Sequence, residues 1–132
     1  MLKLIHPALA LPMLLIACNG AYAAKACGEA VSTADMQACA QSALQAADDE
    51  LNTSYKRLLQ RFSGPSAPGE DNAAARRKLI AAQRAWITFR DADCDAQYQA
   101  HIGGTLRGLV MLGCKQQHTE QRTKQLNSYF PG

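Results

Sequence analysis

The densest group of chemically capable side chains lies in one stretch, residues 82–94. It holds the chain's only tryptophan, Trp86, together with Arg84, Arg90 and Asp91. Aromatic residues at helical spacing usually belong to a core, so we predict that Trp86 packs inside the fold with ion pairs at its rim. The competing hypothesis is that Arg84, Arg90 or Asp91 lies exposed beside Trp86 and contacts a partner protein.

Catalytic chemistry finds little support, and we predict no enzyme, no cofactor and no metal site. Neither His101 nor His118 is near a cysteine that is expected to be free. The cysteine spacing fits no zinc pattern. Asp91, Asp93 and Asp95 alternate along an expected helix, so their carboxylates splay around it and make a poor metal cage.

The charge balance bears on the class of partner. The chain has 132 residues, with 14 basic and 11 acidic side chains and a formal net charge of +3. The basic residues are interleaved with acidic ones rather than gathered in one stripe, so a nucleic-acid partner is not expected. The length fits a single domain with a small core.

The N-terminus predicts export. Lys3 precedes an apolar run over residues 8–17, and small residues at Ala21 and Ala23 then offer a signal peptidase site. The apolar run is shorter than the roughly 20 residues that a membrane span needs. We therefore predict a signal peptide over residues 1–23, a mature domain over residues 24–132 and a periplasmic location.

A second processing hypothesis stays open. The run from Leu15 to Cys18 resembles a bacterial lipobox, in which the cysteine is acylated and becomes the mature N-terminus. Acylation of Cys18 would make the chain an outer-membrane lipoprotein, and this lipid anchor would be its one attachment to a membrane. Under either hypothesis the protein is exported.

The remaining cysteines form an even set, which in an oxidising compartment predicts two disulfides. Cys94 and Cys114 stand at similar heights when two helices fold about the intervening turn, given the rise of ~1.5 Å per residue. Cys27 can likewise fold back onto Cys39. We favour these two local pairs, while a crosswise pairing of Cys27 with Cys114 and Cys39 with Cys94 stays open.

Helix signals dominate the rest of the chain. After a capping residue at Ser32 or Thr33, apolar residues recur every three or four positions as far as Phe62. A loop rich in proline and glycine follows over residues 63–69. The second helix is expected from about residue 73 to about residue 99, with an apolar stripe formed by Ala75, Leu79, Ala82, Trp86, Phe89 and Ala96.

A turn at Gly103 and Gly104 separates the second helix from a third, expected from about residue 106 to residue 129. Short loops make successive helices antiparallel. The predicted fold class is therefore all-α, a small disulfide-stapled bundle of two long antiparallel helices plus a shorter third helix.

From about Cys27 to Leu126 the chain resembles the LprI-like family of exported bacterial proteins, named for a lysozyme inhibitor. The resemblance is carried by the stretch from Ala82 through Trp86 to Cys94 and by the order of the four cysteines. Residues 103–105 read Gly-Gly-Thr, where the family usually has Gly-Gly-Ser. The resemblance implies a helical domain in the periplasm or on a lipid anchor.

The resemblance further implies a binding protein that blocks a lysozyme by occlusion and not by catalysis. The candidate contacts are two groups, one on the second helix and one at the following turn: Arg84, Trp86, Arg90, Asp91, His101, Gly103, Gly104 and Arg107. The slight positive charge works against long-range attraction to a basic lysozyme. The alternative is an envelope interaction, structural or stress-accessory module with no lysozyme target. The oligomeric state stays open.

Overall fold

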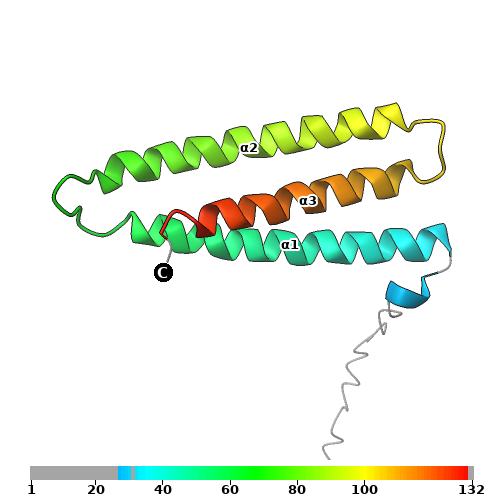
Figure 1. Cartoon of the computed structure of the whole chain (residues 1–132), viewed down its shortest axis with the longest axis horizontal. Helices are drawn as coiled ribbons and strands as arrows, with labels where there is room; N and C mark the ends of the chain where they lie inside the picture. The colour runs from blue at the N-terminus through cyan, green and yellow to red at the C-terminus, as the bar shows by residue number, and fades with distance from the viewer. Residues whose placement is uncertain (1–26, 31, 131–132) are drawn as a thin grey trace, which may run out of the picture.

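The computed structural model describes residues 27–30 and 32–130. All the regular secondary structure in this part of the chain is helical (Figure 1). A short 3-10 turn is followed by three α-helices: η1 Cys27–Glu29, α1 Thr33–Arg61, α2 Asn72–Ala100 and α3 Arg107–Asn127. The predicted all-α class is confirmed. Among the described helices, none has the length and apolar character to cross a membrane. The predicted leader over residues 1–23, with Cys18, lies outside the described residues.

Local side-chain chemistry sets the helix ends close to the predicted positions. The Ser32 hydroxyl accepts a hydrogen bond from the Asp35 backbone N–H at 3.1 Å, which caps the start of α1. The Asp71 carboxylate accepts one from the Ala74 N–H at 2.8 Å and caps α2. In the loop between them Gly69 has φ +84°, a conformation that favours glycine.

The three helices form an elongated bundle in which α3 lies between the other two (Figure 1). The chain reverses direction at each loop, so α1 and α2 are antiparallel and α3 runs parallel to α1. Helix α3 packs along both neighbours, whereas the backbones of α1 and α2 approach each other at few places. Polar or long side chains must therefore bridge α1 and α2.

Two disulfides close the end of the bundle opposite the 63–71 loop. One joins Cys27 to Cys39 and the other joins Cys94 to Cys114, each with a Cα–Cα distance of 5.6 Å. The local pairing is confirmed and the crosswise pairing is not formed. In the chain-entropy account each bond contributes about 3 kcal/mol to stability, because each closes a short loop.

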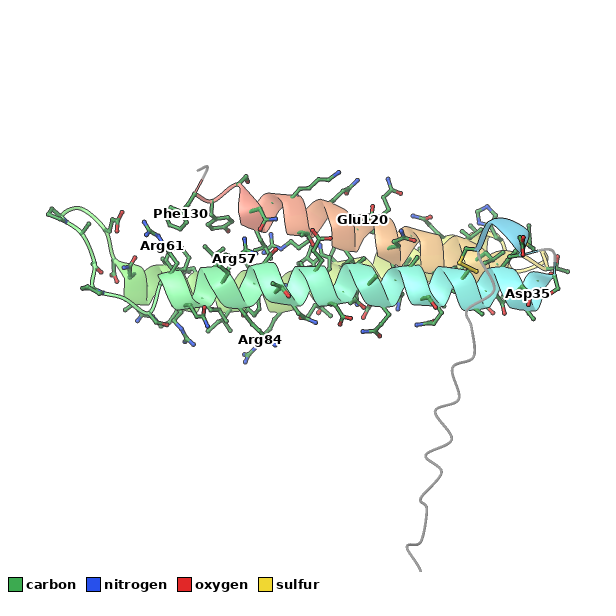
Figure 2. The ribbon with its side chains drawn as sticks, turned by 90° about the horizontal axis from the view of Figure 1, so that it is seen from below. Asp35, Arg57, Arg61, Arg84, Glu120 and Phe130 are labelled. Carbon is green, nitrogen blue, oxygen red and sulfur yellow. A yellow bond between two sulfur atoms is a disulfide. The ribbon has the colours of Figure 1, made fainter. Side chains whose placement is uncertain are left out.

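The apolar core lies toward the 63–71 loop. It joins all three helices through Leu51, Leu58, Phe62, Leu79 and Leu126. Past the end of α3, the rings of Tyr129 and Phe130 meet the Phe62 ring edge-on, and the Arg61 guanidinium lies 4.5 Å from the centre of the Phe130 ring. Figure 2 shows Phe130 returning over the end of α1 beside Arg61.

The predicted apolar stripe of α2 is wrong in part. Phe89 is 55% exposed, and Ala82 and Ala96 are exposed as well. The face that turns inward instead contains Leu79, Gln83, Trp86, Arg90 and Cys94, in steps of three and four residues. Two of these five are polar, and side chains on α1 and α3 supply their partners.

Candidate functional site

Arg90 lies at the centre of a polar cluster that joins all three helices. Its Nη1 donates to Asp48 Oδ1 on α1 at 3.2 Å and to Thr119 Oγ1 on α3 at 3.2 Å. The Thr119 hydroxyl in turn donates to Asp48 Oδ1 at 3.3 Å. Thr119 is fully buried. The arginine of the 82–94 stretch therefore bridges α1 and α2, which have few backbone contacts of their own.

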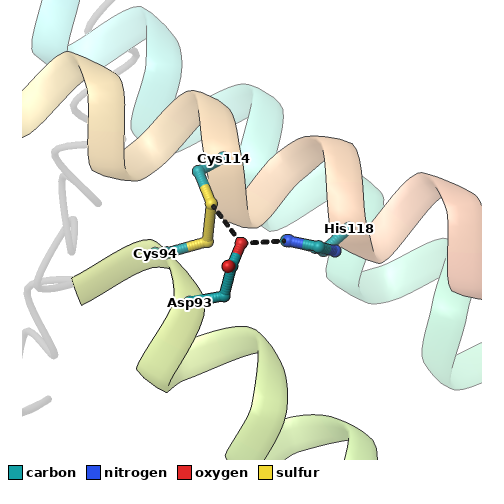
Figure 3. Close-up of side chains that lie close together, drawn as sticks. All are labelled: Asp93, Cys94, Cys114 and His118. Carbon is teal, nitrogen blue, oxygen red and sulfur yellow. Dashed lines mark hydrogen bonds and ion pairs between the residues drawn. A yellow bond between two sulfur atoms is a disulfide. The ribbon is translucent and has the colours of Figure 1, made fainter. Parts of the chain in front are cut away.

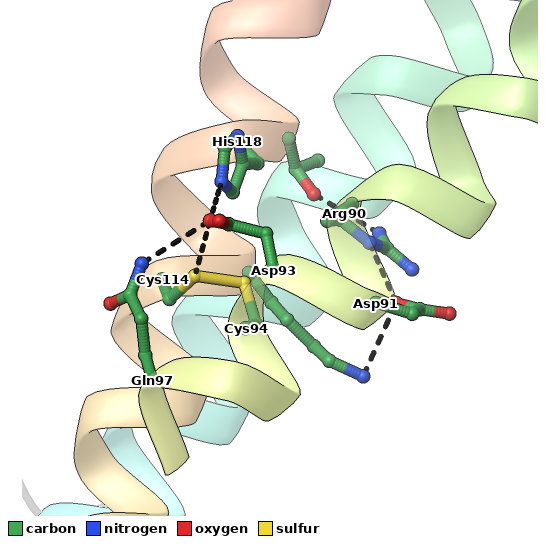
Figure 4. The surroundings of a disulfide bond; sticks show 9 residues. Arg90, Asp91, Asp93, Cys94, Gln97, Cys114 and His118 are labelled. Atoms are coloured by element: carbon green, nitrogen blue, oxygen red, sulfur yellow. Dashed lines mark hydrogen bonds and ion pairs between the residues drawn. A yellow bond between two sulfur atoms is a disulfide. The ribbon is translucent and has the colours of Figure 1, made fainter. Parts of the chain in front are cut away.

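The other edge of the Arg90 guanidinium faces Asp91. Arg90 Nε donates to Asp91 Oδ1 at 3.0 Å, and Lys115 Nζ lies 3.3 Å from the same oxygen (Figure 4). Burial raises the pKa of the Asp91 carboxyl, but the charge of Arg90 and the hydrogen bonds from Arg90 and Lys115 outweigh it. The net pKa lies below the ordinary value of 3.8. Arg90 also lies 5.1 Å above the Trp86 ring.

A second polar contact links α2 and α3 closer to the apolar core. Arg122 Nε donates to Gln83 Oε1 at 3.0 Å, and Arg122 Nη1 donates to Gln125 Oε1 at 3.2 Å. Gln83 is only 7% exposed, so this hydrogen bond satisfies a buried amide. Neither residue stands out in the sequence as a candidate contact, because a lone glutamine among alanines and one arginine forms no motif.

A third cluster surrounds the Cys94–Cys114 disulfide. Asp93 Oδ2 lies 2.9 Å from His118 Nε2 and accepts a hydrogen bond from Gln97 Nε2 at 3.3 Å. Cys114 Sγ lies 3.9 Å from the same oxygen, and a disulfide sulfur has no proton to donate. Figure 3 shows the side chains of Asp93, Cys94, Cys114 and His118 converging. The sequence alone did not predict this cluster, although His118 follows Cys114 by four residues.

The turn between α2 and α3 is held from inside by Arg107. Its Nε donates to the Tyr98 hydroxyl at 2.9 Å, and its Nη1 donates to the carbonyls of Ile102 at 3.4 Å and Gly104 at 3.1 Å. The guanidinium also lies 5.8 Å from the Tyr98 ring centre. A shallow pocket under the turn is lined by Ala100, His101, Gly103, Gly104, Leu106, Arg107 and Val110. These hydrogen bonds therefore fix the backbone conformation of the turn.

Comparison with known proteins decides the family. The model of the family described as "Lysozyme inhibitor LprI" matches residues 23–126. The chain belongs to this family. A relative in Rhizobium meliloti (strain 1021), an uncharacterized protein, is 36% identical over 105 residues, which are 76% of this chain and 75% of the relative. No solved structure matches the chain.

The structure divides the candidate contacts of this LprI-family chain into two kinds. The first kind is partly buried and makes contacts inside the bundle. The guanidinium groups of Arg90 and Arg107 donate hydrogen bonds to other helical residues, and the Trp86 ring packs against the apolar core. Arg84 is exposed and points away from the bundle (Figure 2), and Asp91 keeps a partly exposed carboxylate. The accessible candidates at the turn are His101, Gly103 and Gly104.

Two large apolar side chains at this turn of the LprI fold, which were not among the predicted contacts, are exposed. Ile102 is 53% exposed and Leu106 is 48% exposed. An exposed apolar patch rimmed by polar groups marks a protein-contact surface, and these two side chains are the candidates for such a patch at the turn. Their signal in the sequence is an isoleucine and a leucine on either side of a Gly-Gly pair, where a solvent-facing turn would normally carry polar residues.

Replacing Arg107 with alanine is expected to loosen this turn. The variant loses the hydrogen bonds to Tyr98 and to two carbonyls, at a cost of about 1–2 kcal/mol in the free energy of unfolding. Amide hydrogen exchange of residues 102–106 should become faster while exchange in α1 changes little. Arg84→Ala, in an exposed arginine, is the control. Unchanged exchange at the turn in Arg107→Ala would show that Arg107 does not hold it.

Proposed function

We propose that this LprI-family chain is an exported envelope protein that binds a lysozyme and blocks its cleft without catalysis. The family description supports the lysozyme target. The leader pattern supports export, either with cleavage after Ala23 or with acylation of Cys18. The protein needs no cofactor for this role, because occlusion requires only a complementary surface.

The observation that carries the proposal is the turn between α2 and α3, which hydrogen bonds from Arg107 hold in one conformation. Arg107 holds the backbone of Ile102 and Gly104 in place, while the side chains of Ile102 and Leu106 face solvent. A rigid segment loses little conformational entropy on binding, so its apolar contacts contribute more of their energy to affinity.

His101 adds a polar contact to the apolar tip. Its Nδ1 lies 2.8 Å from the Gln97 carbonyl oxygen, and a carbonyl can only accept, so Nδ1 carries the proton in this arrangement. The exposed ring then offers Nε2 to a partner. Nε2 is then an acceptor. A lysozyme cleft carries two carboxyl groups, and the protonated one, which serves as the general acid, can donate to Nε2.

Substituting Ile102 with aspartate tests the proposal. We expect the wild-type chain to inhibit at least one of the animal-type, goose-type and invertebrate-type lysozymes. Ile102→Asp should weaken this inhibition by about tenfold or more, because a buried interface anchor is typically worth over 1 kcal/mol. The measurement is residual muramidase activity against inhibitor concentration.

Ile87→Asp is the matched control, since Ile87 is a comparably exposed isoleucine, at 42%, on the flank of α2. It should inhibit like the wild type. If both variants lost the same amount of inhibition, the effect would not be specific to the turn, and the turn would not be the contact. No inhibition of any of the three lysozyme types by the folded wild-type chain would refute the proposed target and favour an envelope module with another partner.

A further inference from the structure

The cluster around the Cys94–Cys114 disulfide contains the donor set of a metal site. Asp93 and Cys94 are neighbours on α2, and Cys114 and His118 lie one helical turn apart on α3. One ligand atom from each of these four residues lies within 4.8 Å of all the others. Two sulfurs, one imidazole nitrogen and one carboxylate oxygen are ligands that Zn²⁺ accepts in tetrahedral geometry.

The distances between these atoms are close to those of a tetrahedral site. Zinc–ligand bonds of about 2.0–2.3 Å place neighbouring ligand atoms about 3.3–3.8 Å apart. Asp93 Oδ2 lies 2.9 Å from His118 Nε2 and 3.9 Å from Cys114 Sγ. The two sulfurs are the exception. The disulfide holds them at bonding distance, and neither is a thiolate, which is the form of cysteine that binds a metal.

We propose that reduction of the Cys94–Cys114 disulfide creates a site for a divalent cation of the Zn²⁺ class, with Asp93 and His118 as the other ligands. A dithiol reductant of the thioredoxin class gives two electrons and two protons to the disulfide, which becomes two thiols while the reductant becomes a disulfide. The cation then displaces both thiol protons and binds two thiolates, with no further change in oxidation state.

The surroundings suit such a site. Cys94 is fully buried and Cys114 nearly so, while the side chains of Asp93 and His118 are partly exposed and offer a route for the cation. Gln97 Nε2 donates to the Asp93 carboxylate, and the Phe89 ring meets the His118 ring edge-on with 5.4 Å between centres. The hydrogen bond from Gln97 (Figure 4) holds the Asp93 carboxylate in place from outside, as supporting groups do at known metal sites.

The test uses the full chain with Cys18, Cys27 and Cys39 replaced by serine, so that Cys94 and Cys114 are the remaining thiols. The chain is reduced with a phosphine under anaerobic conditions and titrated with Co²⁺. We expect a thiolate-to-cobalt charge-transfer band and the d–d bands of tetrahedral cobalt, saturating at one equivalent and abolished by Zn²⁺. The same chain with its disulfide intact should show neither band.

Two variants assign the remaining ligands. His118→Ala and Asp93→Asn should each weaken cobalt binding by about 10–100-fold or more, since even supporting groups at metal sites have effects of this size. Asp95→Asn, in an exposed acid of the same helix, is the matched control and should bind like the parent chain.

Circular dichroism is recorded alongside. If reduction melts the helices, the cation should restore them, because a bound metal stabilises the folded state. The proposal is overturned if the reduced chain, folded or unfolded, gives no charge-transfer band. It is also overturned if the His118→Ala and Asp93→Asn variants bind as tightly as Asp95→Asn.

Discussion

Replacing Arg90 with alanine is expected to lower the free energy of unfolding by about 2–4 kcal/mol. The substitution removes one guanidinium that contacts Asp48, Thr119 and Asp91. It leaves the fully buried Thr119 hydroxyl without one of its partners and the Asp48 carboxylate without its counter-charge. The Arg90 side chain is 14% exposed and that of Asp48 is 34% exposed, so solvent screens the pair only in part. Urea denaturation followed by circular dichroism measures the loss.

Two further variants give this result its meaning. Arg84→Ala, in the exposed arginine of the same stretch, should change stability by no more than about 0.5 kcal/mol. Arg90→Lys should recover only part of the loss, because one ammonium cannot reproduce the contacts of Nε and Nη1 together. If Arg90→Ala were as stable as Arg84→Ala, Arg90 would not be the bridge between α1 and α2.

The structural role of Arg90 affects how functional experiments are read. A loss of lysozyme binding in Arg90→Ala would follow from a loosened bundle as readily as from a lost contact. Ile102 and Arg84 are better probes, since both are exposed and their side chains hold no other helix in place. Stability should be measured for every variant before its inhibition is compared.

Replacing Leu79 with alanine is expected to destabilise the protein by about 2–5 kcal/mol. Leu79 is 2% exposed and packs in the cluster with Leu51, Leu58 and Leu126, which joins all three helices. Truncating it removes buried apolar surface and leaves a cavity that the surrounding helices close only in part. The measurement is the shift of the urea midpoint at constant slope.

Ile87→Ala on the same helix is the matched control, because it removes a similar amount of side chain from an exposed position. Its effect should stay within about 0.5 kcal/mol. A loss below about 1 kcal/mol in Leu79→Ala would mean that the apolar cluster near the 63–71 loop is not the main support of the bundle, and that the polar bridges and disulfides carry more of its stability.

Local chemistry was sufficient to predict the helices and their ends. Serine and aspartate caps, prolines and glycines act on neighbouring backbone, so their effects can be read from short stretches such as 63–71. The disulfide pairing was also predicted correctly. It depends on distances within one helical hairpin and within one N-terminal turn, and helix geometry alone estimates both.

The inward face of α2 and the groups around the disulfide could not be read in this way. A polarity pattern assigns Phe89 to the core and Gln83 to the surface, yet the structure reverses both, and it places Arg90 partly buried between the helices. Gln83 and Arg90 are stable inside because Arg122 and Asp48, 39 and 42 residues away, meet them. Nothing in the pattern of a single helix reports such partners.

The turn between α2 and α3 shows both levels at once. The Gly-Gly pair identified it in the sequence as a turn and a candidate contact, and this required only the conformational preferences of glycine. Which side chains face a partner depended on tertiary contacts. Arg107 was expected to be available, but Tyr98 and two carbonyls hold it inside, and Ile102 and Leu106 are left exposed. Backbone preferences determine where a chain turns, whereas the competition of distant groups for each side chain decides which surface it presents.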